Sequence, residues 1–244
     1  MNRSRQRRGA RPGPVPPDLL PDRLRWPAAA LLAACVAVAA LLAVHYAGRE
    51  GPGWIDAAVD PRITAAMSRW PSLLARLPDL GTPAPVELVT AALVLACGAT
   101  RRWTGAILTA VTEPTAIGLT EYVLKPLVGR GAAESFPSGH AASMFALAAI
   151  CAVLLVNPPG RLVRGAVRAL LVLAALVVAA AVSAAMVATG AHYFTDVVAG
   201  AAIGTGLVLA GALILDLVTS RVRRARARPV AGGQPRQPAR TPDR

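Results

Sequence analysis

The sequence predicts an all-α membrane protein, a bundle of six transmembrane helices with basic, disordered tails. Three observations predict this fold. Of the 244 residues, 55% are hydrophobic and only 16% are charged, against about 25% charged in an ordinary soluble domain. Six apolar runs approach the roughly 20 residues that a helix needs to cross a bilayer. The Lys and Arg residues gather in alternate segments between these runs. This composition argues against a water-soluble single domain, and the apolar middle of the chain excludes intrinsic disorder there.

The six predicted spans follow one another between two polar tails. They are residues 26–46, 85–100, 103–124, 136–156, 169–188 and 197–217. The first run is longer than the apolar stretch of about 7 to 15 residues in a cleaved signal peptide, and no clear cleavage site ends it. The second run is short and carries Glu87 near its start. We therefore expect one membrane domain over residues 26–217, with disordered tails at 1–25 and 218–244.

The distribution of basic residues predicts the orientation. The two tails and the loops after the second and fourth spans contain 20 of the 26 Lys and Arg residues. Because cytoplasmic loops carry an excess of Lys and Arg, we expect both termini in the cytoplasm and a location in the plasma membrane. The segments after the first, third and fifth spans then face outward.

The first outward segment, residues 50–82, is longer than a simple connection requires. Its apolar residues recur at roughly helical spacing and include Trp54, Ile55, Val59, Ile63, Met67 and Trp70. Two interpretations stay open: a helix along the membrane interface, or a folded cap over the ends of the spans.

The tails and the cysteines limit the choice of partners. The arginine-rich carboxyl tail either binds anionic lipid headgroups or serves only as a topology signal. Nucleic-acid binding is not expected, because no aromatic residues are interleaved with the arginines. The cysteines lie in apolar runs, so they predict neither a disulfide framework nor a metal site; they are Cys35, Cys97 and Cys151.

Two short segments at the predicted outer face carry the chemistry. The first reads Phe-Pro-Ser-Gly-His and ends at His140. Pro137 is suited to the first position of a helix, and Ser138 and Gly139 offer a hydroxyl and open amides where a helix end attracts phosphate. His140 is then a titratable donor beside that anion. The alternative is a simple turn with a surface histidine.

The second segment places His192 four residues before Asp196. On a helix this spacing puts both side chains on one face. A carboxylate that binds one imidazole nitrogen leaves the other free as a nucleophile. The alternative is a charged pair at a helix end, where an Asp is also favoured by the macrodipole.

Two cations precede these segments at the same predicted face. Lys125 and Arg130 supply the positive charge that a phosphoryl group needs, and Glu121 is placed to pair with Lys125 one helical turn away. The alternative is a pair of interface residues whose charged ends extend toward water.

Together these residues resemble the type 2 phosphatidic acid phosphatase (PAP2) superfamily, on its membrane branch related to undecaprenyl-diphosphate phosphatases. The family motif Pro-Ser-Gly-His is intact at residues 137–140, and its third motif keeps His192 and Asp196. The resemblance covers residues 103–217 and implies a six-span bundle that hydrolyses a lipid phosphate or diphosphate at the extracytoplasmic face.

The resemblance also implies roles for the site residues. His192 is the nucleophile that becomes phosphohistidine, and Asp196 orients it. His140 protonates the leaving oxygen and then activates water. The phosphate oxygens are held by Lys125, Arg130, Ser138 and Gly139. No cofactor is implied, and no cluster at the outer face has the ligand spacing of a catalytic metal.

The chain departs from the family pattern in two motifs. Ala132 and Ala133 occupy the Arg-Pro positions of the first motif, so Arg130 must substitute from two residues away. Ala185 and Met186 occupy the Ser-Arg positions of the third, and a Met cannot form the bidentate clamp of an Arg.

These departures leave a second class of function open, a membrane protein that binds lipid phosphate with weakened catalysis. A transporter is a third interpretation, because Glu113 is an acid within a predicted span. Gly200 and Gly204 form a small-residue motif that packs a helix either inside this chain or in a second copy, so the oligomeric state stays open.

Overall fold

The computed structural model describes residues 18–131, 135–156 and 165–227, and within these ranges the chain forms helices and no strand. This confirms the all-α prediction. In chain order the elements are α1 (Asp22–Tyr46), α2 (Trp54–Met67), α3 (Pro71–Arg76), η1 (Pro78–Gly81), α4 (Pro83–Ala99), α5 (Trp103–Gly118), η2 (Leu119–Leu124), α6 (Lys125–Val128), α7 (Gly139–Val156), α8 (Gly165–Ala188) and α9 (Phe194–Ala227).

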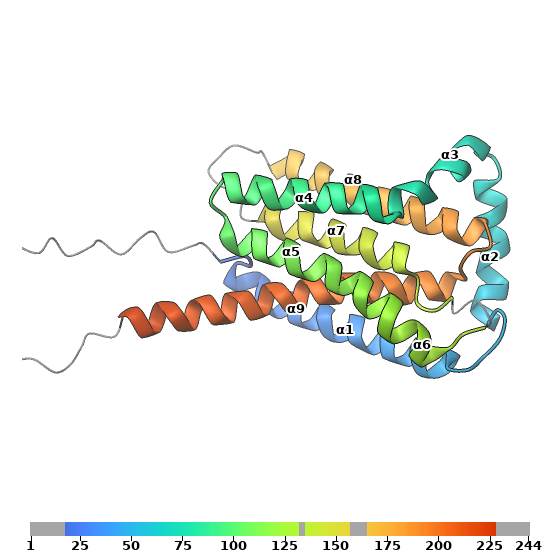
Figure 1. Cartoon of the computed structure of the whole chain (residues 1–244), viewed down its shortest axis with the longest axis horizontal. Helices are drawn as coiled ribbons and strands as arrows, with labels where there is room; N and C mark the ends of the chain where they lie inside the picture. Colours follow the sequence, from blue (N-terminus) through green and yellow to red (C-terminus); the bar gives the residue numbers. More distant parts are fainter. Residues whose placement is uncertain (1–17, 132–134, 157–164, 228–244) are drawn as a thin grey trace, which may run out of the picture.

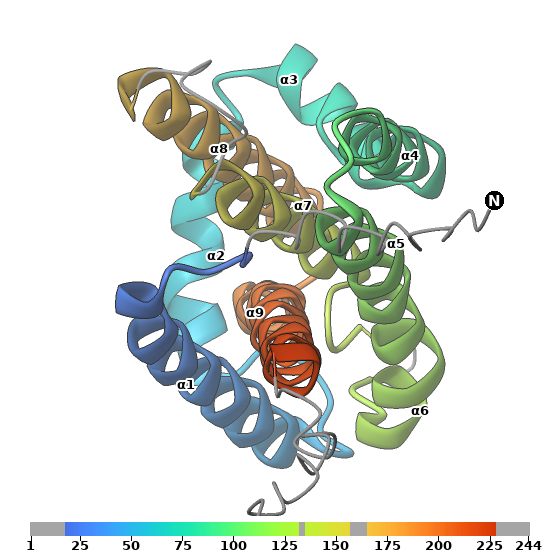
Figure 2. The same ribbon diagram turned by 90° about the vertical axis from the view of Figure 1, so that its left-hand side faces the viewer.

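The long helices run side by side along one axis, and α2 lies across one end of them (Figure 1). Seen along that axis, α9 occupies the middle, with α1 on one side and α7 and α5 on the other (Figure 2). These three helices supply most of the contacts of α9. The described chain begins and ends at the end of the bundle opposite α2 (Figure 1).

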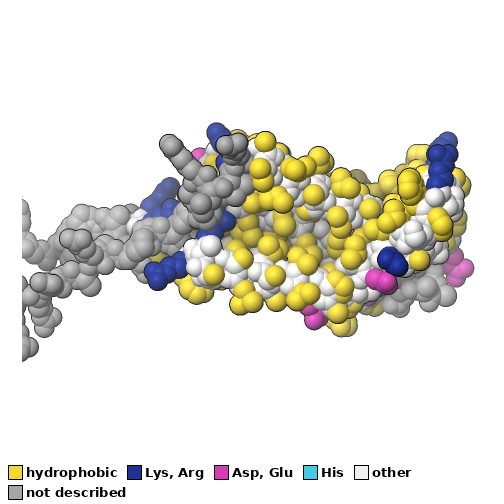
Figure 3. Space-filling view, turned by 90° about the horizontal axis from the view of Figure 1, so that it is seen from above, with side chains coloured by type: hydrophobic (Ala, Val, Ile, Leu, Met, Phe, Trp, Pro, Cys, Tyr) yellow, Lys and Arg dark blue, Asp and Glu magenta, His cyan; other side chains and the backbone are white. Residues whose placement is uncertain are grey.

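Several helices are long and apolar enough to cross a membrane. Within the described ranges they are α1, α7, α8 and α9, and α4 gives a fifth together with α3 and η1, to which it is bent by 59°. The predicted span 103–124 is divided: α5 has 16 residues and continues into the π-helical turn η2. One side of the bundle is covered by hydrophobic side chains, with Lys and Arg gathered toward its two ends (Figure 3).

Two predicted boundaries are wrong at the tails. The helix α9 continues to Ala227, ten residues past the predicted end at 217, because the Ala and Arg residues there favour a helix. Leu19 and Leu20 are buried, and their amides donate to the Asp216 carboxylate at 2.7 and 2.9 Å. Residues 18–25 and 218–227 are therefore ordered, and the rest of the predicted tails lies outside the described residues.

The segment before α4 folds over the end of the bundle. α2 packs against α8 and α9, and its Ile63 contacts a buried cluster of Ala141, Val187 and Val197. Trp54 on α2 and Trp70 just before α3 are 78% and 60% exposed. The helix α2 therefore forms a cap over the helix ends, and the side chains of Trp54 and Trp70 remain largely exposed.

The small residues of α9 bring it against α7. A Cβ on Gly200 would overlap the carbonyl oxygen of Ser138, and one on Gly204 would overlap that of Ala142. Both glycines therefore pack inside this chain, and their close approach joins the first turns of α7 to α9. Those turns carry the two predicted active segments.

Candidate functional site

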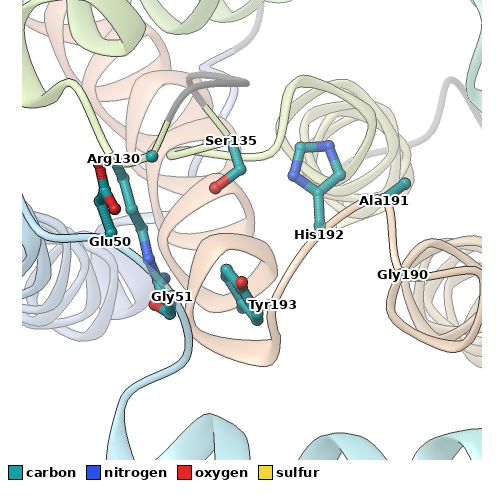
Figure 4. A pocket seen from close by; sticks show the side chains of 9 residues that line it. Glu50, Gly51, Arg130, Ser135, Gly190, Ala191, His192 and Tyr193 are labelled. Carbon is teal, nitrogen blue, oxygen red and sulfur yellow. The ribbon is translucent and has the colours of Figure 1, made fainter.

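The two predicted segments lie at the same end of the bundle, beside α2. The amide of Ser138 donates to the backbone carbonyl of Asp196 at 3.0 Å, which fixes the start of α7 against the start of α9. A pocket of about 390 Å³ opens there. His192, Tyr193, Arg130 and Ser135 surround it, with His192 on the side opposite Arg130 (Figure 4).

His192 is placed by the turn that ends α8. Gly190 has φ +74°, a conformation that a residue with a Cβ rarely adopts. The chain therefore reverses there, and the amide of His192 donates to the carbonyl of Met186 at 3.2 Å. The helix α9 begins only at Phe194. The prediction that His192 and Asp196 share one helical face is thus wrong, because His192 precedes the helix.

His192 and Asp196 nevertheless face each other. The His192 Nδ1 atom lies 3.7 Å from Oδ2 of Asp196, which is beyond hydrogen-bond distance. No described residue gives this buried Nδ1 a hydrogen bond. Asp196 is held instead by the amide of Tyr193, at 3.0 Å, and by the guanidinium of Arg130.

Arg130 is the centre of a buried polar network. Its Nη1 donates to Asp196 and to Oγ1 of Thr195 at 2.8 Å, and its Nη2 donates to Asp56 at 2.6 Å. The rings of Tyr46 and Tyr193 face the guanidinium carbon, with their centroids 3.7 and 4.4 Å away. Arg130 is only 1% exposed. It therefore lines the pocket while its guanidinium nitrogens Nη1 and Nη2 are engaged within the protein.

Asp56, in the first turn of α2, is a residue of this network that the motifs do not reveal. Its carboxylate accepts from the amides of Gly53 and Thr195, each at 2.9 Å. Burial disfavours the charged form, but the hydrogen bonds from Arg130, Thr195 and Gly53 outweigh it and hold the pKa of Asp56 below its ordinary value. Asp56 is therefore a buried carboxylate that stays charged.

Asp60 lies one turn later on α2, and its carboxylate accepts a hydrogen bond from the amide of Phe194 at 3.1 Å. Burial raises the pKa of Asp60, and the nearby carboxylates of Asp56 and Asp196 add to this effect. The spacing of Asp56 and Asp60 on one helix face is the only sequence signal that marks them. Together they satisfy two amides at the start of α9, which helix geometry leaves without partners.

The start of α7 carries the other histidine. The helix begins at Gly139, so Pro137 does not occupy its first position as predicted. The Ser138 hydroxyl accepts from the amide of Ala141 at 3.4 Å and caps the helix weakly. His140 is half-buried, and its ring lies against Gly81 of η1, where a Cβ would come within 2.6 Å of it.

Lys125 is paired in this structure. Its Nζ atom lies 2.6 Å from the Glu121 carboxylate, as the spacing predicts. The same carboxylate also approaches Gly139, where a Cβ would overlap its Oε1 oxygen. Glu121 and Lys125 therefore lie beside the start of α7 and the predicted phosphate position.

The remaining predicted features lie elsewhere. Ala132 and Ala133 are outside the described residues. Met186 is 7% exposed and contributes to the site only through its backbone. Glu113 is 2% exposed inside the bundle, beside Ser143 and Thr90, and does not line the pocket. Within the described parts of the chain, no three His, Cys, Asp or Glu side chains are arranged to hold a metal ion.

Comparison with known proteins agrees with the motifs. Searches among curated proteins and among solved structures found no significant match. A family model, described as the PAP2 superfamily, matches residues 63–219, which include α4 to α8, most of α9 and every predicted site residue. Because this match covers more than half of the chain, the protein belongs to the PAP2 superfamily.

Proposed function

We propose that the protein is an integral membrane phosphatase that hydrolyses a lipid phosphate or diphosphate through a phosphohistidine intermediate. One observation carries this proposal: His192 lines a pocket at the end of an apolar helical bundle, with Asp196 at its Nδ1 side and the start of α7 bonded to the start of α9. Membership of the PAP2 superfamily, whose members hydrolyse phosphate esters, supports the reaction type.

The chemistry proceeds in two steps. The free Nε2 of His192 attacks phosphorus, the bond to the leaving oxygen breaks, and His140 gives that oxygen its proton. His140 then takes a proton from a water molecule, whose oxygen attacks phosphorus; the phosphorus–nitrogen bond breaks, its electron pair returns to Nε2 of His192, and inorganic phosphate leaves. Asp196 stabilises the positive charge that develops on His192.

The phosphate oxygens have a group of donors beside this pair of histidines. In the proposal, Lys125, the Ser138 hydroxyl and the Gly139 amide hold them, while Arg130, whose Nη1 and Nη2 bind Asp196 and Asp56, orients Asp196 from the pocket wall. Lys125 must first exchange the Glu121 carboxylate for the substrate. This exchange is inexpensive, because the pair is partly exposed, with 20% and 36% of the two side chains accessible.

The surroundings of the pocket support a lipid substrate. A second pocket of about 530 Å³ shares His192 and Tyr193 with the first. A third, of about 210 Å³, shares Val187 with the second and is lined almost entirely by apolar side chains of α2, α7, α8 and α9. In the proposal, the alkyl or prenyl chain lies along these pockets and continues into the bilayer.

The proposed topology has six spans. The sixth is the helical run of α5, η2 and α6, which extends from Trp103 to Val128. With both termini in the cytoplasm, the pocket opens at the extracytoplasmic face of the plasma membrane. The excess of Lys and Arg at the end of the bundle that carries the termini supports this orientation.

Purified protein in detergent tests the activity. Phosphate release is measured from phosphatidic acid, phosphatidylglycerol phosphate and a prenyl diphosphate, for the wild type and for His192→Ala. We expect release from at least one lipid by the wild type, none by the variant, and no loss of activity on addition of a chelator.

Two outcomes would contradict the proposal. Binding of these lipids without phosphate release would favour the alternative of a lipid-phosphate binding protein. Loss of activity on chelation, restored by magnesium, would exclude the metal-independent histidine mechanism.

A further inference from the structure

We propose that Asp56 is a positioning residue of the reaction, which acts through Arg130 to set the charge beside Asp196 and thereby the protonation of His192. This inference rests on the proposed phosphatase function for its kinetic consequences. Asp56 lies before the family match, which begins at residue 63. The family motifs therefore do not include it.

The contacts make Asp56 and Asp196 partners of a single cation. Oδ2 of Asp56 lies 2.6 Å from Nη2 of Arg130, and Asp196 binds Nη1 of the same guanidinium. The side chains of all three residues have no exposed surface. Solvent therefore screens these charges little, and their interactions are stronger than on the surface.

The charge of this group is unbalanced. Among the described residues, no second Lys or Arg contacts either carboxylate. Two carboxylates and one guanidinium leave one net negative charge, which faces His192 through Asp196. The hydrogen bonds that hold the pKa of Asp56 low keep this charge present at neutral pH. A protonated His192 balances it.

Asp56 also fixes the backbone that carries His192. Its carboxylate accepts one hydrogen bond from the amide of Thr195, at 2.9 Å, and another from the hydroxyl of Thr195, at 3.0 Å. The hydroxyl of Thr195 in turn accepts from Arg130. The first turn of α9 is thus tied to the first turn of α2, so the cap over the bundle contributes to the catalytic geometry.

His192 experiences other charges as well. They come from Asp196 on α9, Asp60 on α2, Arg130 after α6, His140 on α7 and Glu50 after α1, with the Glu121 and Lys125 pair beyond His140. A substitution at Asp56 leaves each of these side chains in place. The effect of Asp56 is therefore separable by substitution.

Three variants separate charge from structure. Asp56→Asn raises the charge of the group from −1 to 0, and should move the acid limb of kcat/KM to lower pH by about 0.5 to 1 unit. Arg130→Gln lowers the charge to −2 and should move the limb to higher pH. The double variant restores −1, and its limb should return toward the wild-type position.

The separate effects of the substitution on kcat and on KM provide a second test. In Asp56→Asn we expect kcat to fall about tenfold with KM within about twofold, because the phosphate donors at Lys125 and Gly139 are untouched. Asp79→Asn removes an exposed carboxylate from η1, in the same outer segment. It is the matched control and should leave the pH profile unchanged.

A spectroscopic titration makes the test independent of turnover. The protein has only three histidines, so the titration of His192 can be followed by NMR with histidine-specific labelling, with His192→Ala to assign it. Its midpoint should move in the same directions as the kinetic limb. If Asp56→Asn does not fold, the comparison of Arg130→Gln with the double variant still isolates Asp56.

The outcomes distinguish the two proposals. An unmoved midpoint in Asp56→Asn, or shifts of the same sign in Asp56→Asn and Arg130→Gln, would overturn the role of Asp56. Absence of turnover in the wild type, with the expected NMR shifts, would overturn only the phosphatase function.

Discussion

At the scale of single residues, the two histidines are held in different ways. His192 lies in the turn after α8, and its orientation depends on Gly190 and on the carboxylate of Asp196. His140 lies on the first turn of α7, packed against η1. This difference fits the two proposed roles, a nucleophile with a charged partner and a proton donor on the neighbouring helix.

The proposed roles predict different responses to the leaving group. His140→Ala should reduce kcat for a lipid substrate by about 10²- to 10⁴-fold, the usual contribution of general acid catalysis. The loss should be much smaller for an activated aryl phosphate, whose leaving oxygen needs little protonation. His192→Ala should be inactive with both substrates.

Steady-state rates and trapping of phosphoenzyme under non-acidic conditions check this prediction. Asp196→Asn is the intermediate case, because the imidazole remains while its partner loses its charge. Phosphoenzyme that persists in His192→Ala, or that disappears only in His140→Ala, would reverse the two assignments.

At the scale of elements, α9 connects the pocket to the middle of the bundle. Its first turn is bound by Asp56, Asp60 and Asp196, and its next turns lie against α7 without intervening side chains. Gly200 and Gly204 make this approach, so the separation of the two active segments depends on them.

We predict that Gly204→Ala destabilises the protein. A Cβ there would overlap the carbonyl of Ala142, so the helices must separate, at a cost of about 1 to 3 kcal/mol. Thermal unfolding in detergent should show a lower Tm than the wild type. Activity should fall too, since the separation moves the start of α7.

Gly118→Ala provides the matched control. Gly118 is also helical, but a Cβ at this position meets nothing within 4 Å. Its Tm should be unchanged or slightly higher, because Ala favours a helix over Gly. Equal stability of the two variants would show that α7 and α9 do not pack as closely as described.

At the scale of the whole molecule, α2 and the described chain ends lie at opposite ends of the bundle (Figure 1), and the pocket lies at the end that carries α2. The helix α9 spans this length, with Asp196 at one end and several arginines at the other. The proposed orientation therefore predicts which positions are accessible from each side of the membrane.

Cysteine labelling in intact cells checks the orientation. In a variant without the three native cysteines, Leu80→Cys on η1 should react with a membrane-impermeant thiol reagent added outside. Arg224→Cys on α9 should react only after permeabilisation. Both positions are exposed in the structure. The reversed pattern would place the pocket on the cytoplasmic side.

The sequence by itself determined the class of the protein and the identity of its motif residues. Apolar runs predict membrane helices because the bilayer demands about 20 apolar residues for each span. The Glu121–Lys125 pair was also predictable, because side chains one helical turn apart lie close together regardless of the tertiary environment of the helix. Motif spacing identified His140, His192 and Asp196 and led to the PAP2 superfamily.

Only the tertiary structure decided how these residues are held. Asp56 precedes Arg130 by 74 residues, and the ring of Tyr46 reaches the same guanidinium from the end of α1. No local pattern marks such contacts, because they arise where α1, α2 and α9 converge at one end of the bundle. The engagement of Arg130 with two buried carboxylates depends on that convergence, since a buried charge needs partners from whichever elements enclose it.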